Sequence, residues 1–489
     1  MKKFQTKMWC SLTLAVFLAL FLVPAWSQQS GSSPAPTASD SSAGAPPAAT
    51  ANGGPDIENP PLSGLDEPAS EPAYGGRSYL VPGIQISESV NSTSNGLASN
   101  RSGTNEIARG LGSLDLQKVW KTSRMGLDYI AGGTVYQGHV NQAHLGSAYQ
   151  VHTFSFDERI LWRTGQFAFR DSFSFLPEGA FGSGSYGGSG AFNSGAGSGG
   201  VAGVGSIPGG VGIGIGSIGI QPRITNFSGI DLTQALSPRS TVVVSVGYNY
   251  TDFLANAQSS LPLINSQMSS AQIGYDYLLN HHDRLSATYA YQNFRFPSAG
   301  SGNINAHIWH FTYGHRVTGK LNLVLGGGPQ LIIFHNPTLT LPNKISATGR
   351  AQLSYQASSR TSAQFSYNYQ VSPGSGFFAG SNTNLVHVSL NHTLGRRWTL
   401  TMDGGYSYSS RLQTSLLGAS TASHYDYWYV GSSMRRQLGR YFGAFMSYQY
   451  NDIRFNGTVC TTPGTCGNTS ARQTGLVGID WHPHPFRLD

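Results

Sequence analysis

Two glycine-rich segments have the spacing of a phosphate-binding loop. Gly182-Ser-Gly-Ser-Tyr-Gly187 and Gly195-Ala-Gly-Ser-Gly-Gly200 both match the pattern G-x-G-x-x-G. This motif binds a pyrophosphate only where a strand ends and a helix begins, because the amides that open the helix point at the phosphates. Both matches lie in a Gly/Ser-rich stretch that no helical periodicity follows. We therefore expect no nucleotide site and no cofactor.

Two histidine pairs suggest metal binding, His281-His282 and His482-Pro-His484. A zinc site needs further ligands in a tetrahedral arrangement, and no carboxylate or cysteine is placed to complete one. Solvated histidines and no metal site are the expectation. A Ser–His pair of the kind used by a barrel lipase depends on proximity in space, which a sequence does not reveal. We predict that the protein is not an enzyme.

The first 27 residues have the layout of a secretory signal peptide. Three lysines precede an apolar core at 12–23, and Ala25-Trp26-Ser27 offers small residues for cleavage. A membrane-anchoring helix is the alternative, but the apolar run is short for a bilayer span. We expect residues 1–27 to be removed by cleavage at about Ser27, together with Cys10.

Two cysteines then remain, Cys460 and Cys466. In an exported protein a close, even pair indicates a disulfide. A metal site is the competing interpretation, but no histidine or carboxylate lies between them. We predict a loop disulfide that closes one small ring and does not hold the fold together.

Composition favours an exported β-protein with a separate leader. Charged residues make up 11%, glycine accounts for 62 of 489 residues, and the mean hydropathy is only −0.20. Residues 28–105 are rich in Pro, Ala and Ser, so few apolar side chains offset the entropy of ordering them. We expect a disordered periplasmic leader there. The Lys and Arg residues outside the signal peptide and the leader are scattered and form no basic run, so we expect no nucleic-acid binding.

Period-two alternation dominates the rest of the chain. In 242–250, Val242, Val244, Val246, Tyr248 and Tyr250 alternate with small or polar residues, and the segments 363–369 and 398–408 do the same. Alternate residues of a strand face opposite sides. The polar side is mostly Ser, Thr, Asn, Gln and Gly rather than Lys and Glu. That favours a water-filled lumen behind a lipid-facing wall.

Charged residues on the polar phase are the candidate functional groups of such a lumen: Arg170, Arg350, Asp276 and Asp403. Two interpretations stay open. They form an interior network of ion pairs and hydrogen bonds, or they create a field that selects solutes. Asp171 lies on the phenylalanine phase, where a charge facing lipid is costly.

The connections alternate in length. Short turns such as 164–166 and 280–283 alternate with longer polar or Gly-rich stretches such as 177–223 and 372–383. Tyrosine pairs recur beyond the short turns, as at Tyr248/Tyr250 and Tyr406/Tyr408, in the place of an outer aromatic girdle. This arrangement predicts an all-β, transmembrane antiparallel barrel of about 16 strands over residues 106–489.

In its pattern of strands and connections the chain resembles porin-like outer-membrane β-barrel proteins of Gram-negative bacteria, from about residue 124 to residue 481. The segment Phe167-Ala-Phe-Arg-Asp-Ser-Phe-Ser-Phe-Leu-Pro-Glu-Gly179 is similar to a strand and loop of an uncharacterised branch of them. One feature departs from the pattern. Many such barrels end on an aromatic residue that is recognised during assembly, whereas eight residues follow Trp481 here.

The expected function is passive transport of small hydrophilic solutes across the outer membrane. The alternatives are a surface-exposed structural or adhesive barrel with a closed lumen, and a barrel that exports a polymer. The expected partners are outer-membrane lipid and lipopolysaccharide, the barrel-assembly machinery and small hydrophilic solutes, with a homo-oligomer left open. The Gly-rich loop at 179–219 is expected to fold into the lumen, since its apolar end would prefer a partner.

Overall fold

The fold is known from a computed structural model. It describes residues 78–94, 103–138, 148–178, 220–254, 263–297, 302–336, 341–372, 376–395, 397–413, 422–457 and 468–488. The signal peptide, most of the leader, the Gly-rich loop at 179–219 and both cysteines of the predicted disulfide lie outside these residues. Among the described residues, no helix is long and apolar enough to cross a membrane.

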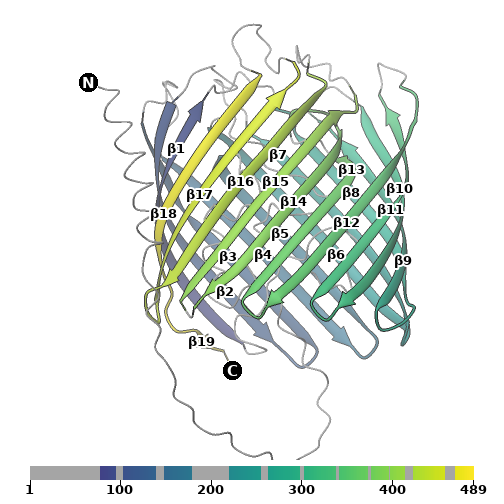
Figure 1. The fold of residues 1–489 in the computed structure, drawn as a ribbon, viewed down its shortest axis with the longest axis horizontal. Coiled ribbons are helices and arrows are strands. Elements are labelled where there is room, and N and C mark those ends of the chain that lie inside the picture. Colours follow the sequence, from purple (N-terminus) through teal and green to yellow (C-terminus); the bar gives the residue numbers. More distant parts are fainter. Residues whose placement is uncertain are drawn as a thin grey trace, which may run out of the picture. The chain divides into compact units, whose positions relative to one another are not determined.

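All the described strands belong to one sheet (Figure 1). In chain order they are β1 (Tyr79–Ser94), β2 (Gly103–Val119), β3 (Ser123–Gly138), β4 (Ala148–Trp162), β5 (Gly165–Glu178), β6 (Ile220–Ser237), β7 (Ser240–Phe253), β8 (Ser266–Leu278), β9 (Asp283–Arg295), β10 (Asn303–Thr318), β11 (Leu321–His335), β12 (Lys344–Ser358), β13 (Thr361–Ser372), β14 (Ser381–Leu394), β15 (Trp398–Arg411), β16 (His424–Gln437), β17 (Phe442–Phe455), β18 (Thr469–Trp481) and β19 (Phe486–Arg487).

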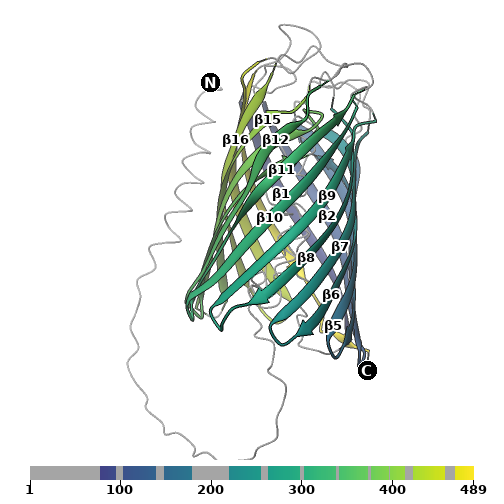
Figure 2. The same ribbon diagram turned by 90° about the vertical axis from the view of Figure 1, so that its right-hand side faces the viewer.

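The sheet closes on itself. Each strand from β1 to β18 pairs antiparallel with its neighbours in sequence, and β1 pairs with β18, from Ile84–Trp481 to Ser94–Ala471. The strands run obliquely around the barrel in two perpendicular views (Figures 1 and 2). Closure leaves none of the described strands β1 to β18 as an edge strand of the sheet, and such an edge would otherwise be a site for aggregation.

The wall has eighteen strands where the sequence predicted about sixteen. The two additional strands are β1 and β2, which lie wholly or partly in the range assigned to the leader. The barrel therefore begins at Tyr79 rather than at residue 106. The first strand has a weak sequence signal, because its apolar residues are few and its lipid-facing phase includes Glu88. Its inward phase is small and polar, with Gln85, Ser87 and Ser89 buried.

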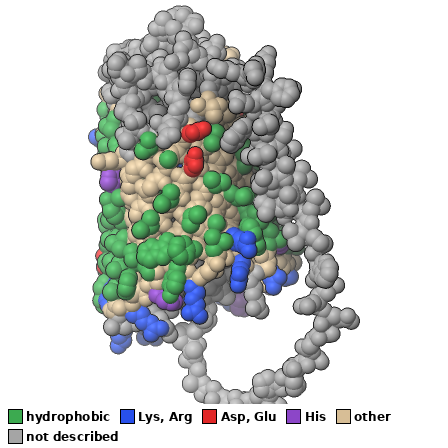
Figure 3. All heavy atoms as spheres, turned by 90° about the vertical axis from the view of Figure 1, so that its left-hand side faces the viewer, with side chains coloured by type: hydrophobic (Ala, Val, Ile, Leu, Met, Phe, Trp, Pro, Cys, Tyr) green, Lys and Arg blue, Asp and Glu red, His purple; other side chains and the backbone are tan. Residues whose placement is uncertain are grey.

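The predicted alternation of the two faces is confirmed. On β7, Val246 and Tyr248 are exposed on the outside, while Ser245 and Asn249 are buried on the inside. Hydrophobic side chains cover much of the outer surface, and Lys and Arg side chains gather below them, at the end that carries the short turns (Figure 3).

Asp171 does lie on the outer phase, and the neighbouring strand explains how it is tolerated. Ser228 on β6 donates a hydrogen bond from its Oγ to the Asp171 carboxylate (2.5 Å), and the Asn226 amide contacts it at 3.4 Å. A polar group that faces lipid is far less costly when neighbours satisfy its hydrogen bonds.

The chain after Trp481 folds back onto the first strand. Phe486 and Arg487 form β19, which pairs with Leu80 and Tyr79 of β1. Lys118 Nζ on β2 donates to the Leu488 carbonyl at 2.7 Å. An aromatic residue near the end of the chain, Phe486, is therefore paired with the barrel, in addition to Trp481.

Candidate functional site

Strands around the whole ring carry polar side chains on their inner face, beside one apolar cluster that is described below. Several buried side-chain atoms of this face have no hydrogen-bond partner among the residues that the structure describes: Gln85 Oε1 on β1, Thr134 Oγ1 on β3, Gln330 Oε1 on β11 and Ser407 Oγ on β15. Buried polar groups are nearly always satisfied by protein or by ordered water. These atoms come from strands around the ring, so polar groups lie on the inner side of the wall in several places.

Arg170 lies on the inner face of β5, where its side chain is only 4% exposed. Its guanidinium lies between two carboxylates, with Nη2 3.1 Å from Asp231 on β6 and Nε 3.5 Å from Asp157 on β4. Asp157 also accepts a hydrogen bond from Arg159 Nε at 2.9 Å. This geometry favours the first of the two interpretations for Arg170, an ion-pair network that ties three strands together.

Asp276 and Arg350 lie on the same face as Arg170 but on other strands of the sheet. Asp276 on β8 is buried and pairs with Arg284 Nη2 of β9 at 3.0 Å. Arg350 on β12 is half-buried and donates to Gln352 Oε1 at 3.1 Å. The backbone of Asp403 pairs with Ser389 and Gly431, and its side chain lies outside the described residues.

The tip of the β13–β14 hairpin is a feature that sequence reasoning missed. The sequence predicts a longer polar or Gly-rich connection at 372–383. Pairing between β12 and β13 stops at Gly349–Tyr369, although β12 continues to Lys344. Beyond Tyr369, β13 no longer forms backbone pairs with β12. Residues 376–380, called the bridge from here on, are all buried.

One side of the bridge contacts the end of β7 and the start of β8. The Ile264 amide donates to the Gly376 carbonyl at 2.7 Å. Gly376 has a φ of +87°, and a Cβ at this position would lie 2.8 Å from the ring of Phe253. Both its conformation and its contact with the ring therefore require glycine.

The other side of the bridge packs against β16 and β17. The Phe377 ring is 4.9 Å from that of Phe455 and 6.1 Å from that of Tyr425, centroid to centroid. Phe378 is 1% exposed, and its ring centroid lies 5.5 Å from that of Tyr425. These are the offset and edge-on distances at which aromatic pairs attract each other.

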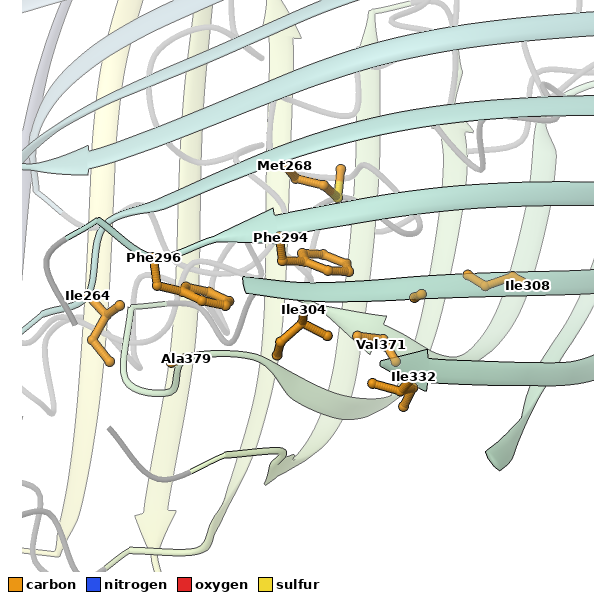
Figure 4. Close-up of a cluster of buried hydrophobic side chains, with 10 residues drawn as sticks. Ile264, Met268, Phe294, Phe296, Ile304, Ile308, Ile332, Val371 and Ala379 are labelled. Carbon is orange, nitrogen blue, oxygen red and sulfur yellow. The ribbon is translucent and has the colours of Figure 1, made fainter. Parts of the chain in front are cut away.

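Between these contacts lies a buried apolar cluster on the inner face of β8 to β11. Its side chains, together with Ala379 of the bridge and Val371, point toward one another (Figure 4). The members are Ile264, Met268, Phe294, Phe296, Ile304, Ala306, Ile308, Ile332, Val371 and Ala379. Each large member contributes about 1.5–3 kcal/mol by leaving water. The cluster therefore holds the bridge firmly against the wall.

The bridge thus connects widely separated parts of the ring. In the shorter direction around the barrel, seven strands (β18 and β1 to β6) lie between β17 and β7. Yet Phe377 touches β17 and its neighbour Gly376 touches β7. The bridge therefore crosses the lumen at the end with the long connections and narrows the passage there. Its sequence signal is Phe-Phe-Ala flanked by two glycines in an otherwise polar stretch.

The described residues contain no group of three or more His, Cys, Asp or Glu side chains placed to hold a metal ion. His482 contacts Asp480 at 3.0 Å, and the His484 ring stacks edge-on against Tyr441 at 4.9 Å. Both histidines of the C-terminal pair are thus engaged in contacts within the barrel's short-turn end.

Some solved structures align with most of the chain at low identity and with TM-scores of about 0.4. OccAB4 from Acinetobacter baumannii aligns with a TM-score of 0.41 and 8% identity, covering 85% of this chain and all of that one. OccK2 (OpdF) from Pseudomonas aeruginosa, solved with glucuronate, gives 0.39 and 9%, covering 84% and 98%. OpdK from the same organism, solved with vanillate, gives 0.39 and 9%, covering 82% and 99%. No family model and no curated protein matches the chain.

Proposed function

We propose that the protein is an outer-membrane channel through which small hydrophilic solutes diffuse passively. The observation that carries the proposal is the polar inner face of an eighteen-stranded barrel. A barrel of about 8 strands is filled by its own side chains, whereas 16 to 18 strands enclose an aqueous channel.

The outer face supports placement in a membrane. Large apolar side chains there are openly exposed, such as Ile86 at 68%, Phe311 at 62% and Ile345 at 77%. Soluble proteins rarely expose apolar surface that is this extensive and contiguous. With the predicted signal peptide, this surface points to the outer membrane. Interaction with the barrel-assembly machinery and homo-oligomer formation stay predictions.

The bridge limits the size of the solutes that can pass through the channel. Because it crosses the lumen from β7 to β17, solutes must pass beside it, which restricts the channel to small molecules. Arg170 is paired with Asp157 and Asp231, and Asp276 is paired with Arg284, so the interior charges largely compensate within each group. We therefore expect mild anion preference at most, weakening as salt rises, since the screening length falls to about 3 Å at 1 M.

Single-channel recording in planar bilayers tests the proposal. We expect steady ohmic conductance from the wild type, and higher conductance from a Phe377→Ala/Phe378→Ala variant in which the bridge is loosened. Phe311→Ala is a matched control, because this ring lies on the outer face and does not border the lumen. It should leave conductance unchanged. Each variant must keep the heat-modifiable band of a folded barrel.

A structural or adhesive barrel with a closed lumen is the second candidate. The bridge itself favours it, because the same contacts that narrow the mouth could seal it. Absence of conductance in both the wild type and the loosened variant, with folding intact, would overturn the channel and leave this second function.

A further inference from the structure

Exposed cations surround the short-turn end of the barrel. Eight short connections join the described strands at this end, and seven of them carry an exposed Lys or Arg side chain. These side chains, called the basic ring from here on, are Lys121, Arg163, Arg239, Lys320, Arg360, Arg397 and Arg440. The eighth connection, at 279–282, carries the exposed pair His281-His282, and none of the eight contains Asp or Glu. These cations are scattered along the sequence, and only the up-and-down order of the strands gathers them at one end.

The basic ring has no acidic partners in the part of the chain that the structure describes. None of the ion pairs there includes any of the seven side chains. Lys320 Nζ donates to the Ala357 carbonyl at 3.2 Å, which leaves its charge uncompensated. Neighbouring short connections are two strands apart, about 10 Å, which is close to the screening length of about 8 Å at physiological salt. Adjacent members of the ring therefore act together on an anion that carries several charges.

The chain itself carries a matching polyanion in the residues that precede the barrel. Residues 28–76 contain six carboxylates and no Lys, Arg or His. Five of the six lie in residues 56–71, called the acidic segment from here on: Asp56, Glu58, Asp66, Glu67 and Glu71. The acidic segment lies outside the described residues, and its charge follows from its sequence.

The chain enters the barrel beside the basic ring. The Val119 amide of β2 donates to Ser78 Oγ at 3.1 Å, next to the connection that carries Lys121. In the other direction around the barrel, the next short connection joins β16 and β17 and carries Arg440. Glu71 is seven residues before Ser78, at most about 25 Å of extended chain. The acidic segment is therefore tethered within reach of several members of the ring.

Tethering favours these carboxylates over other anions. A short flexible link gives the acidic segment an effective concentration of about millimolar at the ring. A single exposed ion pair is weak and screened by salt, but five carboxylates can form several such pairs at once. The acidic segment is thus the occupant that charge and position both favour.

We propose that the acidic segment of this chain binds the basic ring at the short-turn end of its own barrel. Its carboxylates accept charge-assisted hydrogen bonds from the Lys and Arg side chains of several connections. The bound segment offsets part of the ring's positive charge, so fewer anions collect at this end than the ring alone would attract. The interaction involves the ends of the hairpins and not the lumen, so it holds for an open channel and for a closed barrel alike.

Electron paramagnetic resonance of the full-length protein in phosphatidylcholine nanodiscs tests the inference. A nitroxide attached at Leu65→Cys reports whether the acidic segment is immobilised. At about 50 mM NaCl we expect a large immobilised fraction, which should disappear at 1 M NaCl, where the screening length is about 3 Å. Replacing the five carboxylates by their amides should give the mobile spectrum at both salt concentrations.

Two double variants separate the basic ring from charge elsewhere. Lys121→Gln/Arg440→Gln removes two exposed ion pairs, so the ratio of bound to free segment should fall about fivefold. Arg295→Gln/Lys344→Gln is the matched control, because it removes one exposed Arg and one exposed Lys at the end with the long connections. It should leave the spectrum unchanged. Each variant must keep the heat-modifiable band of a folded barrel.

Three results would overturn the inference. The first is a wild-type spectrum that is the same at low and high salt, and the second is an equal loss of immobilisation in the control Arg295→Gln/Lys344→Gln. The third is complete release of the acidic segment at low salt when phosphatidylglycerol is added to the nanodiscs, which would assign the basic ring to anionic lipid. None of these measurements depends on conductance, so a failure here is distinguishable from a failure of the proposed channel.

Discussion

Removing one aromatic contact of the bridge should strongly raise the population of the undocked bridge without destabilising the rest of the barrel. Phe378 is 1% exposed, and its ring packs on Tyr425 of β16. Replacing a buried phenylalanine by alanine costs about 3–5 kcal/mol, because it removes apolar contacts and leaves a cavity. Taking about 3 kcal/mol for a site at the mouth, the population of the undocked bridge should rise about 150-fold, since each 1.4 kcal/mol is a factor of ten.

Amide hydrogen exchange in detergent micelles measures this effect. The Leu412 amide donates to the Gly380 carbonyl at 3.0 Å, and the Ile264 amide donates to the Gly376 carbonyl at 2.7 Å, so both amides are protected only while the bridge is docked. In Phe378→Ala their exchange should accelerate about 10²-fold. The Leu161 amide, bonded to the Thr122 carbonyl at the short-turn end, should not change.

The reasoning would be refuted if Leu412 and Ile264 exchanged at wild-type rates in the variant. It would also be refuted if Leu161 accelerated by the same factor, because the substitution would then weaken the whole barrel rather than undock the bridge. Phe311→Ala, on the outer face, serves as the control for loss of a ring without loss of the bridge.

The remaining predictions concern charge, covalent structure and topology. Arg170→Gln leaves Asp231 without this cation and Asp157 with Arg159 alone, so the free energy of unfolding should fall by about 3 kcal/mol in a denaturant titration. Arg350→Gln, at a half-buried position, should keep the fold and move the reversal potential in a KCl gradient toward cations. Cys460 and Cys466 should resist thiol labelling until reduced, and the double serine variant should keep its heat-modifiable band, because the closed loop is small. A tag inserted between β11 and β12 should be reachable by antibody on intact cells, whereas one at Ser359 should not.

Much of the wall could be predicted from the sequence because the side-chain period of a strand is local. The alternation from Val242 to Tyr250 by itself assigns each residue to the outer or inner face, and the structure confirms it. The same rule failed for β1, where apolar residues are sparse and Glu88 occupies the outer phase. That strand forms because β2 and β18 both need a partner. The pairing of β1 with β18 closes the ring, and it joins residues almost 400 positions apart.

Sequence phase likewise placed Arg170 on the inner face but could not choose between its two interpretations. That choice depended on Asp157 and Asp231, which register and closure bring to either side of the guanidinium. The position of the Asp171 carboxylate on the lipid-facing phase is explained only by the Ser228 hydroxyl, which lies beside it on the next strand.

The bridge was decided by tertiary structure alone. Its apolar residues, Phe377 and Phe378, stand in a stretch whose glycines and serines are typical of an outer loop. Local propensity does not determine whether such a stretch turns into the lumen or away from the barrel. The direction comes from partners that the barrel brings within reach, Phe253 on one wall and Phe455 on the other. Periodicity is a property of neighbouring residues, whereas the burial of a loop tip depends on which distant surfaces the closed sheet places opposite it.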